Sequence, residues 1–134
     1  MVIPRFIEQA LTNAPITVFG TGQQTRCFGH VADVVDGIIR LLDHPDAIGD
    51  VFNIGAQGEI SMADLALKII EKTGSKSTVE FIPYEKAYEA GFEDMERRVP
   101  DTNKVNGLTG WSATRTLDDI LDETIAEMRM TVRS

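Results

Sequence analysis

Three arginines in two short segments are the side chains of this sequence best suited to binding an anion. Arg26 follows the glycine-bearing loop 20–24, and Arg97 and Arg98 stand directly before Val99–Pro100. A guanidinium presents a planar fork of N–H donors that matches phosphate oxygens. The proline restricts the backbone of the residue before it and so helps to hold the second segment. Both segments predict phosphate-side contacts; ordinary solvated surface charge is the alternative for each.

The glycine loop does not match a nucleotide-binding fingerprint. Gly20 and Gly22 give only G-x-G, and the loop leads into a β-like run instead of a helix. The dinucleotide motif needs a third glycine and a following helix, and a P-loop needs a lysine that is absent here. The loop therefore predicts a tight turn that uses glycine for positive φ.

Four further residues have side chains capable of acid–base chemistry, and none is expected to be catalytic. The sequence favours Asp33 as the N-cap of the following helix and His30 as a packed residue at the end of a strand. Tyr84 and Tyr88 are followed at the fourth position by Tyr88 and Phe92, so neither has a lysine there. Packing and loop anchoring are their predicted roles. A hydrolase built on His30 and Asp33 lacks a nucleophile pattern.

The elements expected to position these residues alternate between helices and short strands. The strands 16–20 and 25–31 are expected to pair as a hairpin around the glycine turn. The predicted class is therefore mixed α/β, a small mixed sheet with flanking helices. The full prediction has helices over 4–13, 32–44, 62–74 and 117–130, strands over 16–20, 25–31, 50–55 and 77–83, and mostly loop with short helical turns over 84–105.

Two helix starts carry a local capping signal. Ser61 with Asp64, and Thr116 with Asp119, have the spacing of a capping box, in which two side chains satisfy backbone N–H groups reciprocally. Gly74 follows the third predicted helix and is expected to close it.

Composition limits the classes of partner. The chain has 134 residues, 43% of them hydrophobic, with a net charge of −8. Attraction to nucleic acid or to an anionic membrane surface is therefore not expected. Cys27 is the only cysteine, which excludes an internal disulfide and a cysteine-based zinc site. No run reaches the roughly 20 apolar residues of a membrane span, and the N-terminal segment lacks a signal-peptide core, so a cytoplasmic protein is predicted.

Six segments together resemble one family. They are "VIPRFIEQAL", "ITVFGTGQQTRCFGHVADVVDGI", "VFNIG", "EISMADLALKI", "FIPYEKAYEAGFEDMERRVPD" and the late "GW". In this order, and over essentially the whole chain, they are similar to the C-terminal, substrate-binding part of extended short-chain dehydrogenase/reductases that act on nucleotide sugars. The pattern resembles UDP-glucuronate decarboxylases and UDP-glucose 4-epimerase-like proteins, and both activities stay open.

The resemblance implies a role for particular residues. The strand over 17–19 would run beside the nucleotide base and contact it through the backbone. Arg26 would contact the ribose and diphosphate side, Arg98 would clamp the diphosphate, and Asp101 would lie close to the ribose. The substrate contacts implied in this way are Thr17, Val18, Phe19, Arg26, Arg98 and Asp101.

The same resemblance implies what the chain does not contain. In the family, a glycine-rich strand-to-helix turn binds NAD and a Tyr-x-x-x-Lys pair supplies the base, and neither motif is present here. The expected fold is the C-terminal portion of an extended short-chain dehydrogenase/reductase without its N-terminal Rossmann domain. Residues 1–134 would form a single nucleotide-sugar-binding domain, a fragment or truncated form. NAD belongs to the full-length family, and this chain is expected to bind no cofactor.

Two functions are therefore predicted as alternatives. In the first, the chain binds the diphosphate part of a UDP-sugar, or of the dTDP equivalent, as the substrate half of an epimerase or decarboxylase that is inactive alone. In the second, it is a non-catalytic oligomerisation module that has lost ligand binding. In the family, segments 30–42 and 51–55 lie near or against the nucleotide-binding sheet. Without that sheet, their apolar faces would be exposed. This exposure predicts a homo-oligomer with exchanged elements.

Overall fold

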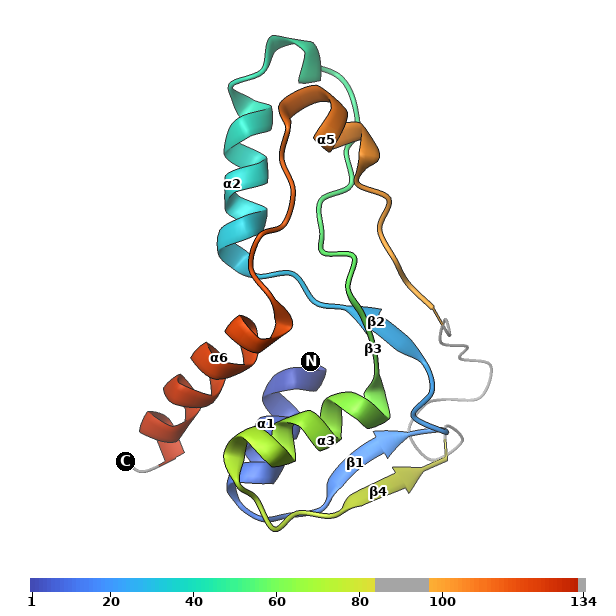
Figure 1. Cartoon of the computed structure of the whole chain (residues 1–134), viewed down its shortest axis with the longest axis vertical. Coiled ribbons are helices and arrows are strands. Elements are labelled where there is room, and N and C mark those ends of the chain that lie inside the picture. Colours follow the sequence, from blue (N-terminus) through green and yellow to red (C-terminus); the bar gives the residue numbers. More distant parts are fainter. Residues whose placement is uncertain (84–96, 133–134) are drawn as a thin grey trace. The chain divides into compact units, whose positions relative to one another are not determined.

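The computed structural model of the chain describes residues 1–83 and 97–132 (Figure 1). Its internal contacts divide the chain into two compact units. Unit 1 comprises Met1–Arg26, Ile60–Arg97 and Leu121–Ser134, and unit 2 comprises Cys27–Glu59 and Arg98–Ile120. None of the helices in these described ranges combines the length and apolar character needed to cross a membrane.

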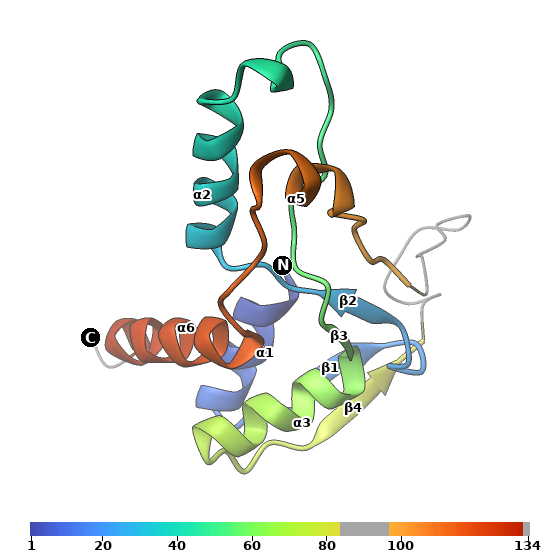
Figure 2. The same ribbon diagram turned by 45° about the horizontal axis from the view of Figure 1, so that its top comes forward.

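Unit 1 packs helices against a short parallel sheet. Helix α1 (Val2–Leu11) leads into β1 (Ile16–Phe19), and α3 (Met62–Thr73) leads into β4 (Val79–Ile82). β1 and β4 lie side by side in Figures 1 and 2 and pair in parallel, from Ile16 with Val79 to Phe19 with Ile82. Apolar side chains of both helices and of β1 form the core with the end of the chain, chiefly Phe6, Ile7, Ile16, Val18, Leu65, Ile69, Leu121 and Ile125.

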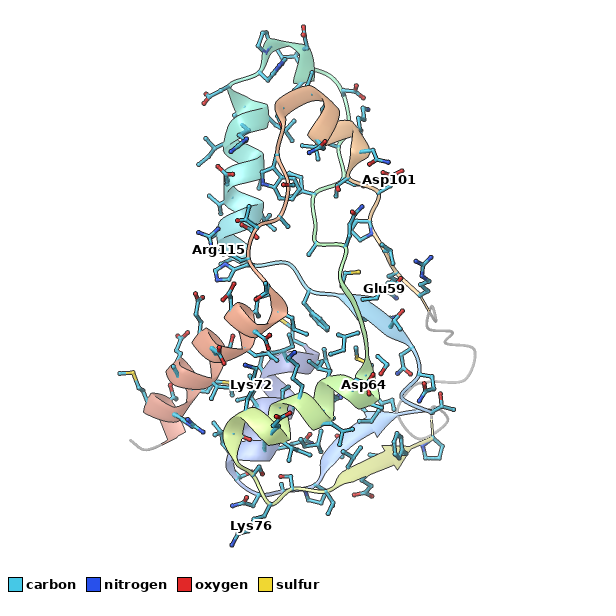
Figure 3. The ribbon with its side chains drawn as sticks, in the orientation of Figure 1. Glu59, Asp64, Lys72, Lys76, Asp101 and Arg115 are labelled. Atoms are coloured by element: carbon cyan, nitrogen blue, oxygen red, sulfur yellow. The ribbon has the colours of Figure 1, made fainter. Side chains whose placement is uncertain are left out.

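Helix α6 (Leu117–Val132), which belongs to unit 1 from Leu121 onward, is held to α3 by polar contacts as well. Lys72, labelled in Figure 3, lies 2.8 Å from the Asp122 carboxylate. Arg129 donates to the carbonyl of Thr73 at 3.2 Å. These contacts lie at the surface, so the buried Leu121 and Ile125 contribute most of the stabilisation.

The predicted hairpin between 16–20 and 25–31 is wrong. β1 pairs with β4, and β2 (Thr25–Cys27) pairs with β3 (Glu59–Ser61). The first residues of α3 form hydrogen bonds with the glycine loop. Ala63 N–H donates to the Gly22 carbonyl, and Met62 N–H donates to the Gln24 carbonyl. These contacts direct the loop toward α3 instead of folding β2 back on β1.

The turn chemistry of the glycine loop is confirmed. Gly20 and Gly22 have φ values of +68° and +74°. A Cβ on Gly22 would lie 3.0 Å from side-chain atoms of Ala63, Phe81 and Val18. Position 22 thus requires glycine both for its backbone conformation and for the close packing around it.

Both predicted capping boxes form hydrogen bonds. The Ser61 Oγ accepts from the Asp64 N–H at 3.1 Å. Thr116 and Asp119 bond reciprocally, each side chain accepting from the other's backbone N–H at 3.2 and 2.9 Å. Helix α3 ends at Gly74 in the left-handed conformation, as predicted.

Unit 2 is built around Trp111. Helices α2 (Val31–Leu42) and α5 (Asn103–Thr109) lie beside this buried side chain, and the short 3-10 turn η1 (Pro45–Ala47) follows α2 in the chain. The Trp111 Nε1–H donates to the Asp33 carbonyl at 2.9 Å. A Cβ on Gly37 would come within 3.1 Å of the indole, so the lack of a side chain lets α2 approach it closely.

The strand predicted over 50–55 is wrong, because residues 51–58 adopt no regular secondary structure. No strand in the described part of unit 2 supplies a ladder for this segment. Its apolar residues pack individually instead. Ile54 lies beside Gly37 of α2, and Lys104 lies 4.8 Å above the Phe52 ring.

Candidate functional site

A pocket of about 200 Å³ in unit 1 contains one of the two predicted phosphate contacts, Arg26. Small-molecule sites usually measure roughly 300–1,000 Å³, so this pocket fits one part of a nucleotide sugar. Helix α1, the end of β1, the loop before β2 and the start of α3 surround it. Its lining residues are Met1, Val2, Arg5, Phe6, Phe19, Gln24, Arg26 and Met62.

Arg26 is half-buried in this lining. One of its terminal nitrogens, Nη1, donates to the Thr25 carbonyl at 2.7 Å, which limits the rotamers of the side chain. The backbone of Thr25 also pairs with that of Arg97 in an isolated parallel bridge. The structure therefore fixes Arg26 at a pocket wall, where a bound anion would find N–H donors with reduced conformational freedom.

Arg5 is a second guanidinium in the same lining, and sequence reasoning missed it. Its Cζ lies 4.6 Å from the ring centroid of Phe19 and 5.3 Å from that of Phe6. Its Nη2 donates to the carbonyl of Thr17 at 3.2 Å. The sequence signal that could have indicated it was a single basic residue, Arg5, next to the apolar positions of the first predicted helix. Its place at the pocket depends on how α1 packs across β1.

The backbone of β1 is partly occupied by side chains on its edge away from β4. Thr17 N–H donates to Gln9 Oε1 at 3.1 Å, and the Gln9 amide donates back to Thr17 Oγ1 at 3.0 Å. Gln24 Nε2 donates to the Phe19 carbonyl at 3.0 Å. A carbonyl oxygen has two lone pairs, so the Thr17 carbonyl can accept a second hydrogen bond beside that from Arg5. Val18 is fully buried. Base contact by 17–19 stays a prediction, and it is confined to backbone groups and the half-buried Phe19.

Arg98 and Asp101 belong to unit 2, and both are exposed. The Asp101 carboxylate accepts from the N–H of Asn103 at 3.0 Å, at the start of α5. Pro100 packs against Gly55, where a Cβ would lie 2.9 Å from the ring. The structure thus gathers Thr17, Phe19 and Arg26 in unit 1. The predicted ligand contacts of Arg98 and Asp101 stay predictions.

The predicted roles of His30 and Asp33 were wrong. His30 is the N-cap of α2, its Nδ1 accepting from the Ala32 N–H at 3.0 Å. Asp33 lies in the first turn and is 3% exposed. Its carboxylate accepts from the backbone N–H and the side chain of both Thr114 and Arg115, at 2.7 to 3.2 Å. Both residues lie near the start of α2, where a capping residue is expected. Because the Asp33 carboxylate binds residues 114–115, His30 caps the helix instead.

The environment of Asp33 favours its ionised form. Burial alone would raise the pKa of this carboxyl, but the hydrogen bonds from Arg115 and Thr114 outweigh burial and lower the pKa. Arg115 is labelled beside the start of α2 in Figure 3. A carboxylate with its lone pairs engaged in this way fixes α2 to the segment around 114–115 and is poorly suited to accept a proton. Tyr84 and Tyr88 lie outside the described residues.

Comparison with known proteins identifies one family. Residues 1–55 match the model of the NAD dependent epimerase/dehydratase family. The chain is 38% identical over 128 residues to UDP-N-acetyl-alpha-D-glucosaminuronate decarboxylase of Bacillus cytotoxicus, covering 96% of this chain and 40% of that protein. It is 34% identical over 131 residues to UDP-glucuronic acid decarboxylase 2 of Arabidopsis thaliana, covering 98% and 28%.

Solved structures show the same relationship. The UDP-glucuronic acid 4-epimerase of Bacillus cereus, in complex with UDP-glucuronic acid and NAD, superposes with a TM-score of 0.82 and 28% identity over 96% of this chain. The UDP-glucose 4-epimerase of Thermotoga maritima with UDP-glucose gives 0.85 and 25% over 98%. The chain spans about 40% of each of these proteins. In sequence and in fold, the chain is thus a partial-length relative of the NAD dependent epimerase/dehydratase family.

Proposed function

We propose that this chain binds the nucleoside-diphosphate part of a UDP-sugar. The observation that carries the proposal is the unit 1 pocket, in which Arg5 and Arg26 stand together in a chain with a net charge of −8. A local pair of guanidinium groups in an acidic protein favours a specific anion over general anion binding. The nucleotide-sugar complexes of the Bacillus cereus and Thermotoga maritima relatives support the same ligand class.

Each predicted contact has a chemical role in this proposal. Arg26 donates charge-assisted hydrogen bonds to diphosphate oxygens. The ring of Phe19 and the carbonyl of Thr17 suit a planar base that carries an N–H donor. Arg98 supplies a further phosphate contact, and Asp101 accepts from ribose hydroxyls. Since the pocket measures about 200 Å³, it holds part of the ligand only.

Hydride chemistry is not proposed for this chain by itself. Epimerases and decarboxylases of this class depend on a positioned nicotinamide cofactor. The sequence has neither the glycine-rich NAD fingerprint nor the Tyr-x-x-x-Lys pair. We therefore assign the chain the substrate-binding half of the reaction, with NAD and the catalytic base belonging to the complete family fold.

The test is calorimetric titration with UDP in low-phosphate buffer. Arg26→Ala and Arg98→Ala should each weaken binding by about 1.5 kcal/mol or more, since a hydrogen bond to a charged group contributes about 1.5–3 kcal/mol. This loss corresponds to roughly a tenfold rise in Kd. Arg40→Ala is the control, because its ion pair with Asp36 is exposed. No saturable UDP binding by the unmodified chain, or equal affinity in all variants, would contradict the proposal.

A second candidate function is a non-catalytic interaction module. The observation that favours it is the row of exposed apolar side chains on α2, including Ile39 and Leu42. Self-association without any UDP binding would support this candidate over the first.

A further inference from the structure

The edge of β1 that faces away from β4 is held by two side chains of α1. At the two ends of β1, the N–H groups of Ile16 and Gly20 donate to carbonyls of the segment that carries β4, at 2.8 and 2.7 Å. Because backbone groups of alternate residues in a strand point to opposite edges, those of Thr17 point away from β4. There Gln9 binds the N–H and the hydroxyl of Thr17, and Arg5 donates to its carbonyl at 3.2 Å. Arg5 and Gln9 are neighbours on one face of α1, so a single helix face fixes both backbone groups of Thr17.

The guanidinium of Arg5 is fixed by aromatic rings as well. Its Cζ lies 4.6 Å from the ring centroid of Phe19 and 5.3 Å from that of Phe6. Both distances are within the roughly 6 Å over which a ring face attracts a cation. Arg5 and Phe19 both line the pocket of about 200 Å³ in unit 1. One side chain of α1 thus links the ring of Phe19 to the carbonyl of Thr17.

Arg5 and Arg26 are bonded to different parts of the site. Arg26 donates to the carbonyl of Thr25, directly after the glycine loop. Arg5 donates to β1 instead, at the carbonyl of Thr17. In the proposed function Arg26 meets the diphosphate, whereas the backbone of β1 and the ring of Phe19 meet the base. The charge of Arg5 adds to the attraction for an anion, but the contacts given above lie on the base side.

The groups that Arg5 holds can distinguish one pyrimidine base from another. The carbonyl of Thr17 can accept one hydrogen bond beside that from Arg5. Uracil and thymine carry an N–H at ring position N3, and this group can donate to such a carbonyl. Cytosine has a bare nitrogen lone pair at N3, so two acceptors would face each other and the hydrogen bond would be lost. A carbonyl that is held in one position rejects the wrong base more strongly than a mobile one, because it cannot turn away.

We propose that Arg5 is a positioning residue that makes the site selective for a nucleoside diphosphate whose base carries an N–H donor, uracil or thymine, over one with cytosine. Arg5 acts through its neighbours, since it holds the Thr17 carbonyl that accepts from the base and the Phe19 ring beside it. This inference rests on the proposed function, because it concerns the base end of the same ligand. It adds a side chain of α1 that selects between bases.

The test compares UDP with CDP, which share the diphosphate and differ in the base. Calorimetric titration, with displacement of UDP for the weaker ligand, should show about a tenfold preference of the unmodified chain for UDP, the scale of one hydrogen bond. Arg5→Met keeps an apolar stem and removes the charge and the N–H donors, so this preference should fall to about twofold or less. Arg26→Ala should weaken the binding of both ligands by the same factor and keep the preference. Glu8→Gln, at an exposed position of α1, is the matched control and should change neither affinity.

The ratio of the two affinities separates positioning from other roles of Arg5. A purely structural role, or a direct contact with the diphosphate, would change the affinities for UDP and CDP equally, and equal weakening in Arg5→Met would overturn the proposal. Equal affinity of the unmodified chain for both ligands would also overturn it, while the loss in Arg26→Ala would still support the proposed function. Absence of UDP binding by the unmodified chain would overturn both.

A second variant covers the case in which Arg5→Met does not fold, which circular dichroism would reveal. Arg5→Lys keeps the positive charge but lacks the planar fork that lies over the rings and donates to Thr17. Its preference for UDP should therefore fall at least about threefold, while its affinity for CDP stays within about twofold of the unmodified chain. An unchanged preference in Arg5→Lys would overturn the proposal.

Discussion

At the scale of single residues, the structure separates a buried anion that stabilises the fold from cations that line a pocket. Asp33 is nearly inaccessible and its carboxylate is engaged by Thr114 and Arg115. Arg5 and Arg26 line a pocket instead. Both kinds of charged side chain occur close to the glycine loop in the sequence, and only their three-dimensional partners distinguish the two roles.

Asp33→Asn should destabilise the chain by about 2 kcal/mol at neutral pH, the scale of losing charged hydrogen bonds in a buried site. The new amide would also direct its own donors at the N–H groups of Thr114 and Arg115. Urea unfolding measures the change. Asp36→Asn, at an exposed ion pair, should stay within about 0.5 kcal/mol and serves as the control.

The lowered pKa of Asp33 also fixes a pH dependence. The folded-state pKa lies below the ordinary value of 3.8, so the folded state binds this proton less readily than the unfolded chain. The contribution of Asp33 is then complete above about pH 4 and is lost as the pH falls through the folded-state pKa. The stability difference between the unmodified chain and Asp33→Asn should shrink on acidification below pH 4. A difference that grew instead would contradict the assignment.

At the scale of elements, helix ends are set by local chemistry and strand partners are not. Ser61, Gly74 and Thr116 were identified from residues within one turn of the helix that each of them caps, and the structure has all three in those roles. The caps hold the starts of α3 and α6 and the end of α3, and α3 in turn holds the loop that leads to Arg26.

Ser61→Ala should lower the free energy of unfolding by about 1 kcal/mol, because the Asp64 N–H loses its side-chain acceptor. Urea unfolding followed by circular dichroism gives the value. Ser112→Ala, at an exposed position outside any helix, is the comparison and should change stability by less than about 0.5 kcal/mol. Equal effects of the two substitutions would contradict the capping role.

The sequence predicted α1, α2, α3 and α6, missed α5, and predicted strand pairing poorly, for a physical reason. Two strands separated by a glycine turn predict a hairpin, yet β1 pairs with a strand more than 50 residues away in the chain. The apolar run 50–55 has the composition of a strand, but a strand also requires a hydrogen-bonded neighbour, which composition does not reveal. Arg5 was missed because its place in the pocket follows from tertiary packing of α1. Arg26 could be predicted because it closely follows the glycine loop 20–24, which is recognisable in the sequence.

At the scale of the whole molecule, the net charge of −8 contrasts with the local pair of guanidinium groups in unit 1. Long-range electrostatics should repel polyanions, whereas we propose that the pocket accepts a small diphosphate. The expectation of one domain over 1–134 stays a prediction, because contacts within the chain gather in two units.

Neither duplex DNA nor vesicles containing anionic lipid should retain the chain at about 50 mM salt, where phosphate-driven binding is strong. Mobility shift and vesicle sedimentation measure this directly. Neutral vesicles are the control for binding through the exposed apolar side chains of α2. Salt-sensitive retention on either polyanion would contradict the expectation that binding of anions is confined to the pocket.

The parallel pairing of β1 with β4 has a consequence for how quickly this chain reaches its native state. Ile16 can meet Val79 only after the entire intervening chain, including the Cys27–Glu59 segment of unit 2, has been brought into a closed loop. The entropy lost in that closure precedes the favourable contacts of the pair, so folding should be slow for a chain of this size. Helix α3, whose caps are local, is available early, and its first turn binds the glycine loop. The contact between Gly22 and Ala63 is therefore well placed to set the register before β4 arrives.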